Sequence, residues 1–101
     1  MEYNCRTSGD AFEASLTGRL TFDDQKLFRQ MITEMGEASA ARWVVDLSNL
    51  EFIDSAGLGL LLRIKATSEQ VGKSILLRVP NDGHVRRMLD VSRFDQLFPF
   101  E

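Results

Sequence analysis

A serine at the junction of a strand-like and a helix-like segment is the residue best placed to do chemistry in this chain. Ser55 follows Asp54 and precedes Gly57 and Gly59, within the stretch DLSNLEFIDSAGLGLLL of residues 46–62. Four kinds of site put a serine at such a corner: a phosphate-binding loop, a hydrolase nucleophile, a helix cap and a serine that accepts a phosphate group. Each of them makes a different demand on the neighbouring residues.

The glycines after the serine do not form either of the common nucleotide-binding loops. A P-loop carries a lysine directly after its last glycine, whereas three leucines, residues 60–62, follow the glycines here. The dinucleotide-binding pattern GxGxxG also fails, because Leu62 stands where the third glycine should be. We therefore expect no bound cofactor.

The residue inventory gives little support to a hydrolase or a metal enzyme. The hydrolase motif GxSxG has a glycine two residues before the serine, and here that residue is Ile53. The chain has one histidine, His84, which we expect at the surface near the start of a third helix. One histidine and one cysteine, Cys5, leave no metal site built from these residues. We predict no catalytic residue and no metal ligand, and a small serine hydrolase is kept as an alternative that would need His84 close to Ser55.

A helix cap and a phosphate acceptor both agree with the surroundings of Ser55. Asp54 or Ser55 can cap the following helix, which contributes ~1 kcal/mol. A cap does not explain Gly57 and Gly59, because each glycine costs about 1 kcal/mol against alanine inside a helix. Another surface must therefore come close, either the sheet of the chain itself or a partner. A phosphate on Ser55 would meet the partial positive charge of the first turn and would change the charge of the outer surface.

The helix predicted over residues 55–70 has two apolar faces. One of them is expected to meet the sheet. Its members are Gly57, Leu60, Leu61, Ile64 and Val71. Leu58 and Leu62 lie on the other side with Ser55, where they form a small apolar docking patch unless the third helix covers them.

Hydrophobic periodicity predicts alternating strands and helices around this corner. Strands are predicted over residues 3–6, 11–17, 42–47 and 74–79, and helices over residues 21–36, 55–70 and 83–92. A turn at residues 8–10 joins the first two strands, and Gly18 ends the second. Residues 43–45 are typical of a strand buried on both faces, and residues 94–98 are predicted as a short edge segment before Pro99. Strands separated by helices imply parallel neighbours and right-handed crossovers.

Composition and charge exclude several classes of protein. The 101 residues fit one domain, residues 1–101. The net charge of -3 provides no basic surplus, so no nucleic-acid partner is expected. The longest apolar run, residues 58–62, is far short of the ~20 residues that span a membrane, and the N-terminus does not look like a signal peptide. A lone thiol suits a reducing compartment, so we expect a cytoplasmic protein without a membrane partner.

Residues 44–62, VVDLSNLEFIDSAGLGLLL, closely resemble the signature of the STAS domain, a family named for sulfate transporters and anti-sigma factor antagonists. The segments LTGRL, residues 16–20, and GKSILLRVPNDGHVRRMLDVSRFDQLFPF, residues 72–100, resemble the two halves of that domain. The resemblance implies a single α/β domain with a small, mixed, mostly parallel sheet of four or five strands packed with three or four helices. The free-standing bacterial anti-sigma factor antagonists resemble this chain most.

The resemblance also implies a function in partner switching. Ser55 would be the phosphoacceptor of an ATP-using anti-sigma factor that is a serine kinase, and Asp54 would cap or orient it. The unphosphorylated form would bind that anti-sigma factor and free the sigma factor, and a metal-dependent serine phosphatase would remove the mark. The partner-binding residues implied by the resemblance are Asp54, Ser55, Ala56, Gly57, Leu58, Leu62, Ser48, Asn49 and Thr21. Thr21 stands where some members carry an acidic residue near the interface.

The protein is thus predicted to be a binding module and not an enzyme. Within the family, the alternative is a constitutive accessory subunit, for example of a lipid-transport ABC complex, whose serine faces a partner without being phosphorylated. The sequence leaves two oligomeric states open, a monomer and a weak dimer.

Overall fold

The computed structural model describes residues 1–101 as a five-stranded sheet with three α-helices, which confirms the predicted fold class. In chain order the elements are β1 (Glu2–Ser8), β2 (Ala11–Leu20), η1 (Phe22–Asp24), α1 (Gln25–Glu37), β3 (Arg42–Asp46), β4 (Leu50–Ile53), α2 (Ser55–Gln70), β5 (Ser74–Arg78), α3 (Gly83–Val91) and η2 (Phe94–Gln96), where η marks a short 3-10 helix.

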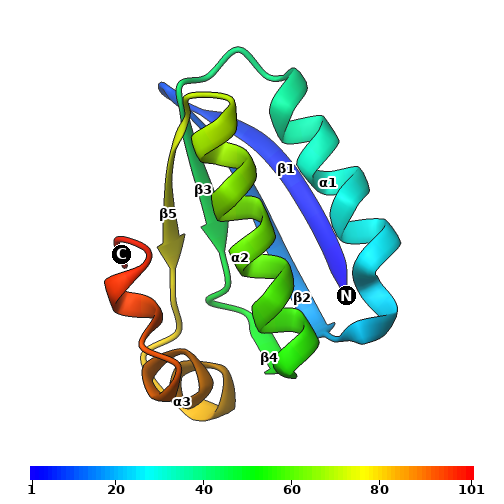
Figure 1. Ribbon diagram of the computed structural model, residues 1–101, viewed down its shortest axis with the longest axis vertical. Helices are drawn as coiled ribbons and strands as arrows, with labels where there is room; N and C mark the ends of the chain where they lie inside the picture. The colour runs from blue at the N-terminus through cyan, green and yellow to red at the C-terminus, as the bar shows by residue number, and fades with distance from the viewer.

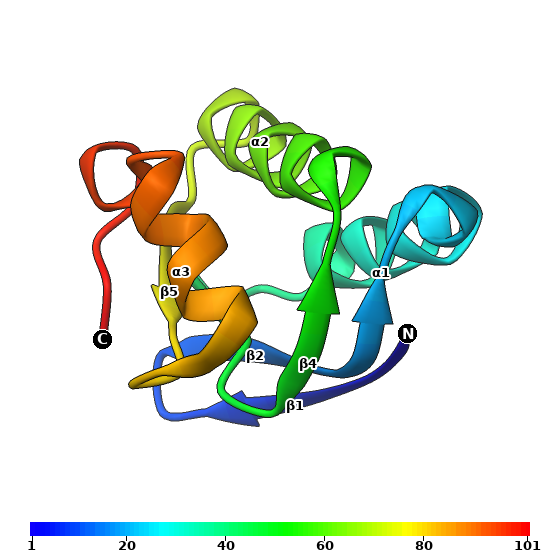
Figure 2. The same ribbon diagram turned by 90° about the horizontal axis from the view of Figure 1, so that it is seen from below.

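The sheet has the order β1-β2-β3-β5, and β4 pairs with the end of β2. Strand β1 runs antiparallel to β2, whereas the pairs β2–β3, β3–β5 and β2–β4 are parallel. Helices α1 and α2 lie side by side on one face of the sheet (Figure 1). Helix α3 packs beside β4, below the carboxyl ends of the parallel strands. Strand β2 leads into η1, and β4 leads into the start of α2 (Figure 2).

The core lies between the sheet and helices α1 and α2. Trp43, Val44 and Val45 are all buried, which confirms that successive side chains of β3 are buried on both faces. Leu60, Leu61 and Ile64 of α2 face the sheet as predicted. Val71 does not, because α2 ends at Gln70 and the Val71 side chain is 50% exposed.

Strand β4 was missing from the predicted elements, and β2 is longer than predicted. Gly18 does not end β2, since its φ of +81° lets the strand pass through an irregularity and continue to Leu20. This extension provides the edge on which the four residues of β4 pair. The β2–β4 pair brings the end of β2 next to the residue that precedes α2, since the Asp54 N–H donates to the Leu20 carbonyl at 3.2 Å.

The start of the first helix and the C-terminal tail also differ from the prediction. The first helix begins with the 3-10 turn of η1 and becomes α-helical at Gln25. The C-terminal tail is not a strand before Pro99, because residues 94–96 form η2. The segment after Pro99 instead lies along β5, where Phe100 forms a parallel bridge with Leu77.

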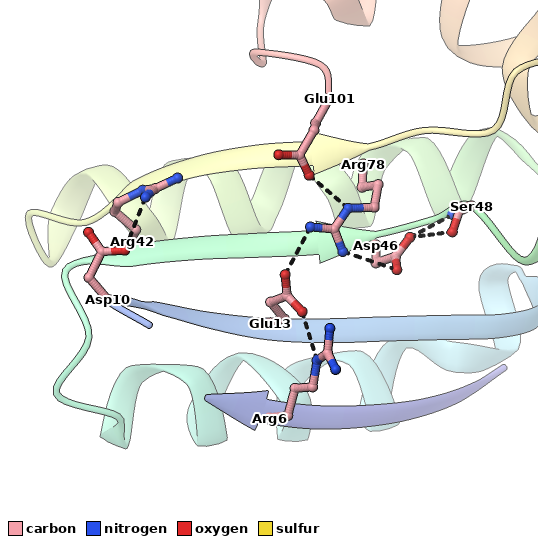
Figure 3. Close-up of polar contacts among 8 residues, drawn as sticks. All are labelled: Arg6, Asp10, Glu13, Arg42, Asp46, Ser48, Arg78 and Glu101. Atoms are coloured by element: carbon pink, nitrogen blue, oxygen red, sulfur yellow. Dashed lines mark hydrogen bonds and ion pairs between the residues drawn. The ribbon is translucent and has the colours of Figure 1, made fainter. Parts of the chain in front are cut away.

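A network of ion pairs crosses the sheet face opposite α1 and α2, which we call the open face (Figure 3). At its centre, Glu13 accepts hydrogen bonds from Arg78 and from Arg6, each at 2.9 Å. Arg78 also contacts Asp46 and Glu101. The Glu13 side chain is only 5% exposed, and hydrogen bonds from Arg78 and then Arg6 hold its pKa below the ordinary value of 4.5 despite its burial.

The open-face network predicts a loss of stability in acid. A carboxyl group whose pKa is lowered by folding stabilises the protein above its unfolded-state pKa, and this contribution is lost as the pH falls through the folded-state pKa. Glu13→Gln should therefore lower the free energy of unfolding at neutral pH by about 2 kcal/mol, as expected for loss of charge-assisted hydrogen bonds. It should also make that free energy less dependent on pH below about 4.5.

Urea denaturation of both proteins, between neutral pH and about pH 3, checks this. Arg42→Gln is the control, because its salt bridge to Asp10 joins two exposed side chains, 47% and 73% exposed, and should be worth less than about 1 kcal/mol. Equal losses for Glu13→Gln and Arg42→Gln would contradict the prediction.

Candidate functional site

Asp54 is the residue that organises the corner before α2. Its carboxylate caps the helix, since Oδ1 accepts a hydrogen bond from the Gly57 N–H at 2.7 Å. Its other oxygen, Oδ2, accepts from the Phe22 N–H at 3.3 Å. Asp54 therefore fixes the start of α2 and also ties η1 to it. Of the two caps that the sequence allowed, the structure uses Asp54.

Ser55 is the first residue of α2, and it is exposed. The hydrogen bonds of this corner end on the Asp54 carboxylate or on backbone carbonyl groups, and the Ser55 hydroxyl takes no part in them. A hydroxyl that is exposed and not engaged is accessible to an enzyme that modifies it.

The structure gives a reason for one of the two glycines of the corner and none for the other. A Cβ atom on Gly57 would lie 2.4 Å from the Leu20 carbonyl oxygen and 2.7 Å from Cγ1 of Ile53. Gly57 is therefore required by the close approach of α2 to the sheet, and it is buried, so it supports the surface from beneath. A Cβ atom on Gly59 would meet nothing within 4 Å. The packing of this chain gives no reason for Gly59, which is exposed one turn after Ser55.

Apolar side chains occupy η1 and the face of α2 that carries Ser55. Leu62 is 43% exposed, and Leu58 is half-buried against the core. The Phe22 side chain is 66% exposed, although its backbone is tied to the start of α2 through Asp54. We call the set of Phe22, Ser55, Leu58, Gly59 and Leu62 the serine surface. Helix α3 packs beside β4, so it leaves Leu62 exposed.

Phe22 and Gly59 belong to the serine surface but not to the predicted partner-binding residues. Thr21 is one of the predicted residues, and the structure gives it a supporting position. The Thr21 N–H and hydroxyl donate to the Asp24 carboxylate at 2.8 and 3.3 Å, and the Asp24 N–H donates to the Thr21 carbonyl at 3.0 Å, so Thr21 holds the turn of η1. The signal for Phe22 was present in the sequence TFDD, where a large aromatic residue follows a capping residue.

The remaining residues on the predicted list lie on two segments. Ala56 is half-buried in the first turn of α2. Ser48 and Asn49 are exposed in the turn between β3 and β4. The Ser48 hydroxyl and N–H donate to Asp46 at 2.6 and 2.9 Å, which ties Ser48 to the open-face network (Figure 3). Although burial raises the Asp46 pKa, these bonds and Arg78 lower it to a net value below the ordinary one.

His84 does not form a hydrolytic site with Ser55. Its Nε2 atom lies 3.0 Å from the Ile53 carbonyl oxygen, and its ring stacks on Phe52 with 4.6 Å between the centroids. The Arg19 guanidinium lies 4.0 Å from the Phe52 ring centroid. His84 is therefore half-buried, and the prediction of a surface residue is wrong. The hydrogen bond between nucleophile and base that a hydrolase requires is absent.

The serine surface is not part of a cavity. The larger of the two hollows, about 560 Å³, is lined by residues 38–41 and by Thr7, Gly9, Asp10 and Phe12. The other, about 430 Å³, is lined by residues of β1 and β2. No group of three or more histidine, cysteine, aspartate or glutamate residues could hold a metal ion. Nor is any helix long and apolar enough to cross a membrane. The geometry favours docking of a partner onto an exposed surface.

Comparison with known proteins relates this architecture to one family. Residues 4–99 match the family model described as Mlab, STAS domain. A STAS-domain containing protein of Pseudomonas aeruginosa is 31% identical over 91 residues, which cover 89% of this chain and 87% of that protein.

Solved structures share the fold at lower identity. An anti-sigma factor antagonist from Mycobacterium paratuberculosis has a TM-score of 0.79 and 22% identity, over 98% of this chain and 83% of that one. The phosphorylated form of the Bacillus cell fate determinant SpoIIAA has a TM-score of 0.68 and 19% identity, over 99% of this chain and 91% of that one. Fold, family model and curated relative agree, and the chain belongs to the STAS domain family.

Proposed function

We propose that this protein is a partner-switching antagonist of an anti-sigma factor. Its unphosphorylated form binds an anti-sigma factor that is also an ATP-using serine kinase, and phosphorylation of Ser55 releases that partner. A metal-dependent serine phosphatase restores the binding form. The observation that carries the proposal is an exposed serine with an unengaged hydroxyl, on a helix face with the exposed Leu62 and next to η1, which carries the exposed Phe22.

A phosphate on Ser55 would change the charge of the serine surface. Phosphorylation adds about -1.5 to -2 charges at pH 7. The Gly57 N–H, which could hold an anion, already donates to the Asp54 carboxylate. The phosphate would therefore lie beside a carboxylate, and its charge would stay at the serine surface. A partner that covers Phe22 and Leu62 would have to bury that charge, and its binding would therefore weaken.

The comparisons support the proposal at the level of the fold. Two of the solved proteins that share the fold are called anti-sigma factor antagonists. One is from Mycobacterium paratuberculosis, and the other is SpoIIAA in its unphosphorylated form. Another is SpoIIAA in a phosphorylated form. A second candidate function is a constitutive accessory subunit, for example of a lipid-transport ABC complex. The matching family model, described as Mlab, STAS domain, is not named for the anti-sigma factor antagonists, so this candidate stays open. Ser55 would then face a partner without being modified.

Intact-mass spectrometry of the protein purified from its native host distinguishes the two candidates. The expected result is a species about 80 Da heavier, the mass of one phosphoryl group, which fragmentation places on Ser55. Ser55→Ala should then lose this species and, used as bait, should capture a serine kinase. The matched control is Ser39→Ala, another exposed serine, in the loop before β3. If every growth condition gave only the unmodified chain, the accessory-subunit candidate would replace the proposal.

A further inference from the structure

One edge of the sheet is open. The outer edge of β5 is covered by the C-terminal tail, since Leu77 donates to the Pro99 carbonyl at 3.0 Å and Glu101 donates to the Leu77 carbonyl at 2.8 Å. Strand β4 has α3 beside it, where His84 contacts the Ile53 carbonyl. Strand β1 pairs with β2 alone and lies at the end of the strand order. Figure 3 shows it along the margin of the sheet.

An open edge strand is a template for another strand, because its outward N–H and C=O groups have no partners. The side chains of β1 alternate between the two faces of the sheet. Tyr3 and Cys5 pack toward the core, whereas Glu2, Asn4 and Arg6 are exposed. Arg6 lies on the open face, where it contacts Glu13. Glu2 and Arg6, of opposite charge, therefore flank Asn4 on one face.

We propose that β1 pairs antiparallel with β1 of a second copy of this chain, with Asn4 at the two-fold axis. In this register Glu2 lies opposite Arg6 of the second copy, and Arg6 lies opposite Glu2 of the second copy. Asn4 faces its own equivalent, and two amide side chains can hydrogen-bond to each other. On the other face, Tyr3 lies opposite Cys5 of the second copy. The Glu2–Arg6 and Tyr3–Cys5 pairs each occur twice, and the Asn4 pair lies on the axis, as a two-fold interface requires.

Neighbouring registers lack this complementarity. A shift of two residues in one direction places Asn4 opposite Glu2, and a shift in the other direction places it opposite Arg6, so no ion pair forms. Opposite charges directly across two strands stabilise their pairing, and like charges destabilise it. The charges of β1 therefore select the register centred on Asn4.

Arg6 can make the new contact and keep its present one. Its Nε atom donates to Glu13 at 2.9 Å, while its side chain is 71% exposed, which leaves the two terminal nitrogens of the guanidinium available. A hollow of about 430 Å³ lies along β1 and β2, and its lining includes Glu2, Asn4, Ser15 and Thr17. These side chains carry acceptor oxygens, so a guanidinium that stands opposite Glu2 has room and partners there.

Self-association through β1 does not depend on the proposed function. No residue of the serine surface belongs to β1. The dimer therefore leaves Ser55 free, and it can exist whether or not Ser55 is phosphorylated.

Sedimentation equilibrium of four proteins tests the interface: the natural chain, Glu2→Arg, Arg6→Glu and the double variant that exchanges the two charges. The natural chain is expected to associate reversibly between micromolar and millimolar concentrations. Each single variant places like charges opposite each other at two positions, and its association constant should fall at least about tenfold. The double variant restores opposite charges across the interface and should recover the association. Arg6→Glu also loses the bond to Glu13, so urea denaturation first shows that each variant is folded. Added salt should weaken the natural dimer, because the ion pairs are exposed.

Amide hydrogen exchange locates the contact in the same samples. Alternate N–H groups of β1 should gain protection as the protein concentration rises, while those of α2 should not. Two results would overturn the inference. One is a natural chain that sediments as a monomer at millimolar concentration. The other is a dimer whose strength is the same in the single and double variants, because such a dimer would use another surface.

Discussion

Ser55→Glu is expected to weaken binding of the anti-sigma partner by roughly two to four powers of ten, whereas Ser55→Ala should bind as tightly as the unphosphorylated chain. A partner that covers Phe22 and Leu62 excludes water from the head of α2. A charge buried there without compensation costs ~3–5 kcal/mol, and this converts into the stated loss of affinity. The Asp54 carboxylate already accepts from the Gly57 N–H, so it repels the new charge and leaves it without that donor.

Isothermal titration calorimetry of each variant with the partner captured by Ser55→Ala measures this effect. Ser39→Glu is the matched control, because it adds the same charge to an exposed serine at the other end of the domain, before β3. Its affinity should equal that of the natural chain. Equal affinities for Ser55→Ala and Ser55→Glu would show that no switch operates at this residue, while binding of both variants would still agree with an accessory subunit.

The parts of the site that local chemistry determines could be predicted from the sequence. Helix α2 has the predicted bounds of residues 55–70, because Asp54 provides a cap at its start and Gly72, with a φ of +73°, provides a turn just after its end. Ser55 is exposed, as required of a modification site, for the same local reason: it is the first residue after the cap, where the helix has not yet met the sheet.

The parts that depend on distant residues could not be predicted. Strand β4 is only four residues long, and it exists because β2 continues past Gly18 to offer it an edge. Phe22 joins the serine surface through a hydrogen bond to Asp54, 32 residues away. His84 is held by the Ile53 carbonyl and by the ring of Phe52, neither of which its own neighbours in the sequence reveal. In each case the position of the residue follows from pairing between segments far apart in the chain.

The two glycines of α2 provide the sharpest test of how the site is built, because the same substitution should have opposite effects two residues apart. Gly57→Ala should lower the free energy of unfolding by about 3 kcal/mol, the upper part of the usual range for overpacking. The new methyl group would lie 2.4 Å from the Leu20 carbonyl oxygen, and a backbone atom inside a sheet cannot move away easily. A loss of this size lowers the Tm by roughly 12 °C or more in a domain of this length.

Gly59→Ala should instead raise the free energy of unfolding by up to about 1 kcal/mol, since alanine is the better helix former and its methyl group meets nothing within 4 Å. Urea denaturation of the two variants beside the natural chain measures both changes. The stabilised Gly59→Ala variant should bind the anti-sigma partner more weakly, because its methyl group stands on the serine surface one turn from Ser55. A Gly59→Ala variant that is more stable and binds unchanged would mean that the partner does not approach α2 there. A Gly57→Ala variant as stable as Gly59→Ala would mean that α2 can move away from the sheet at no cost.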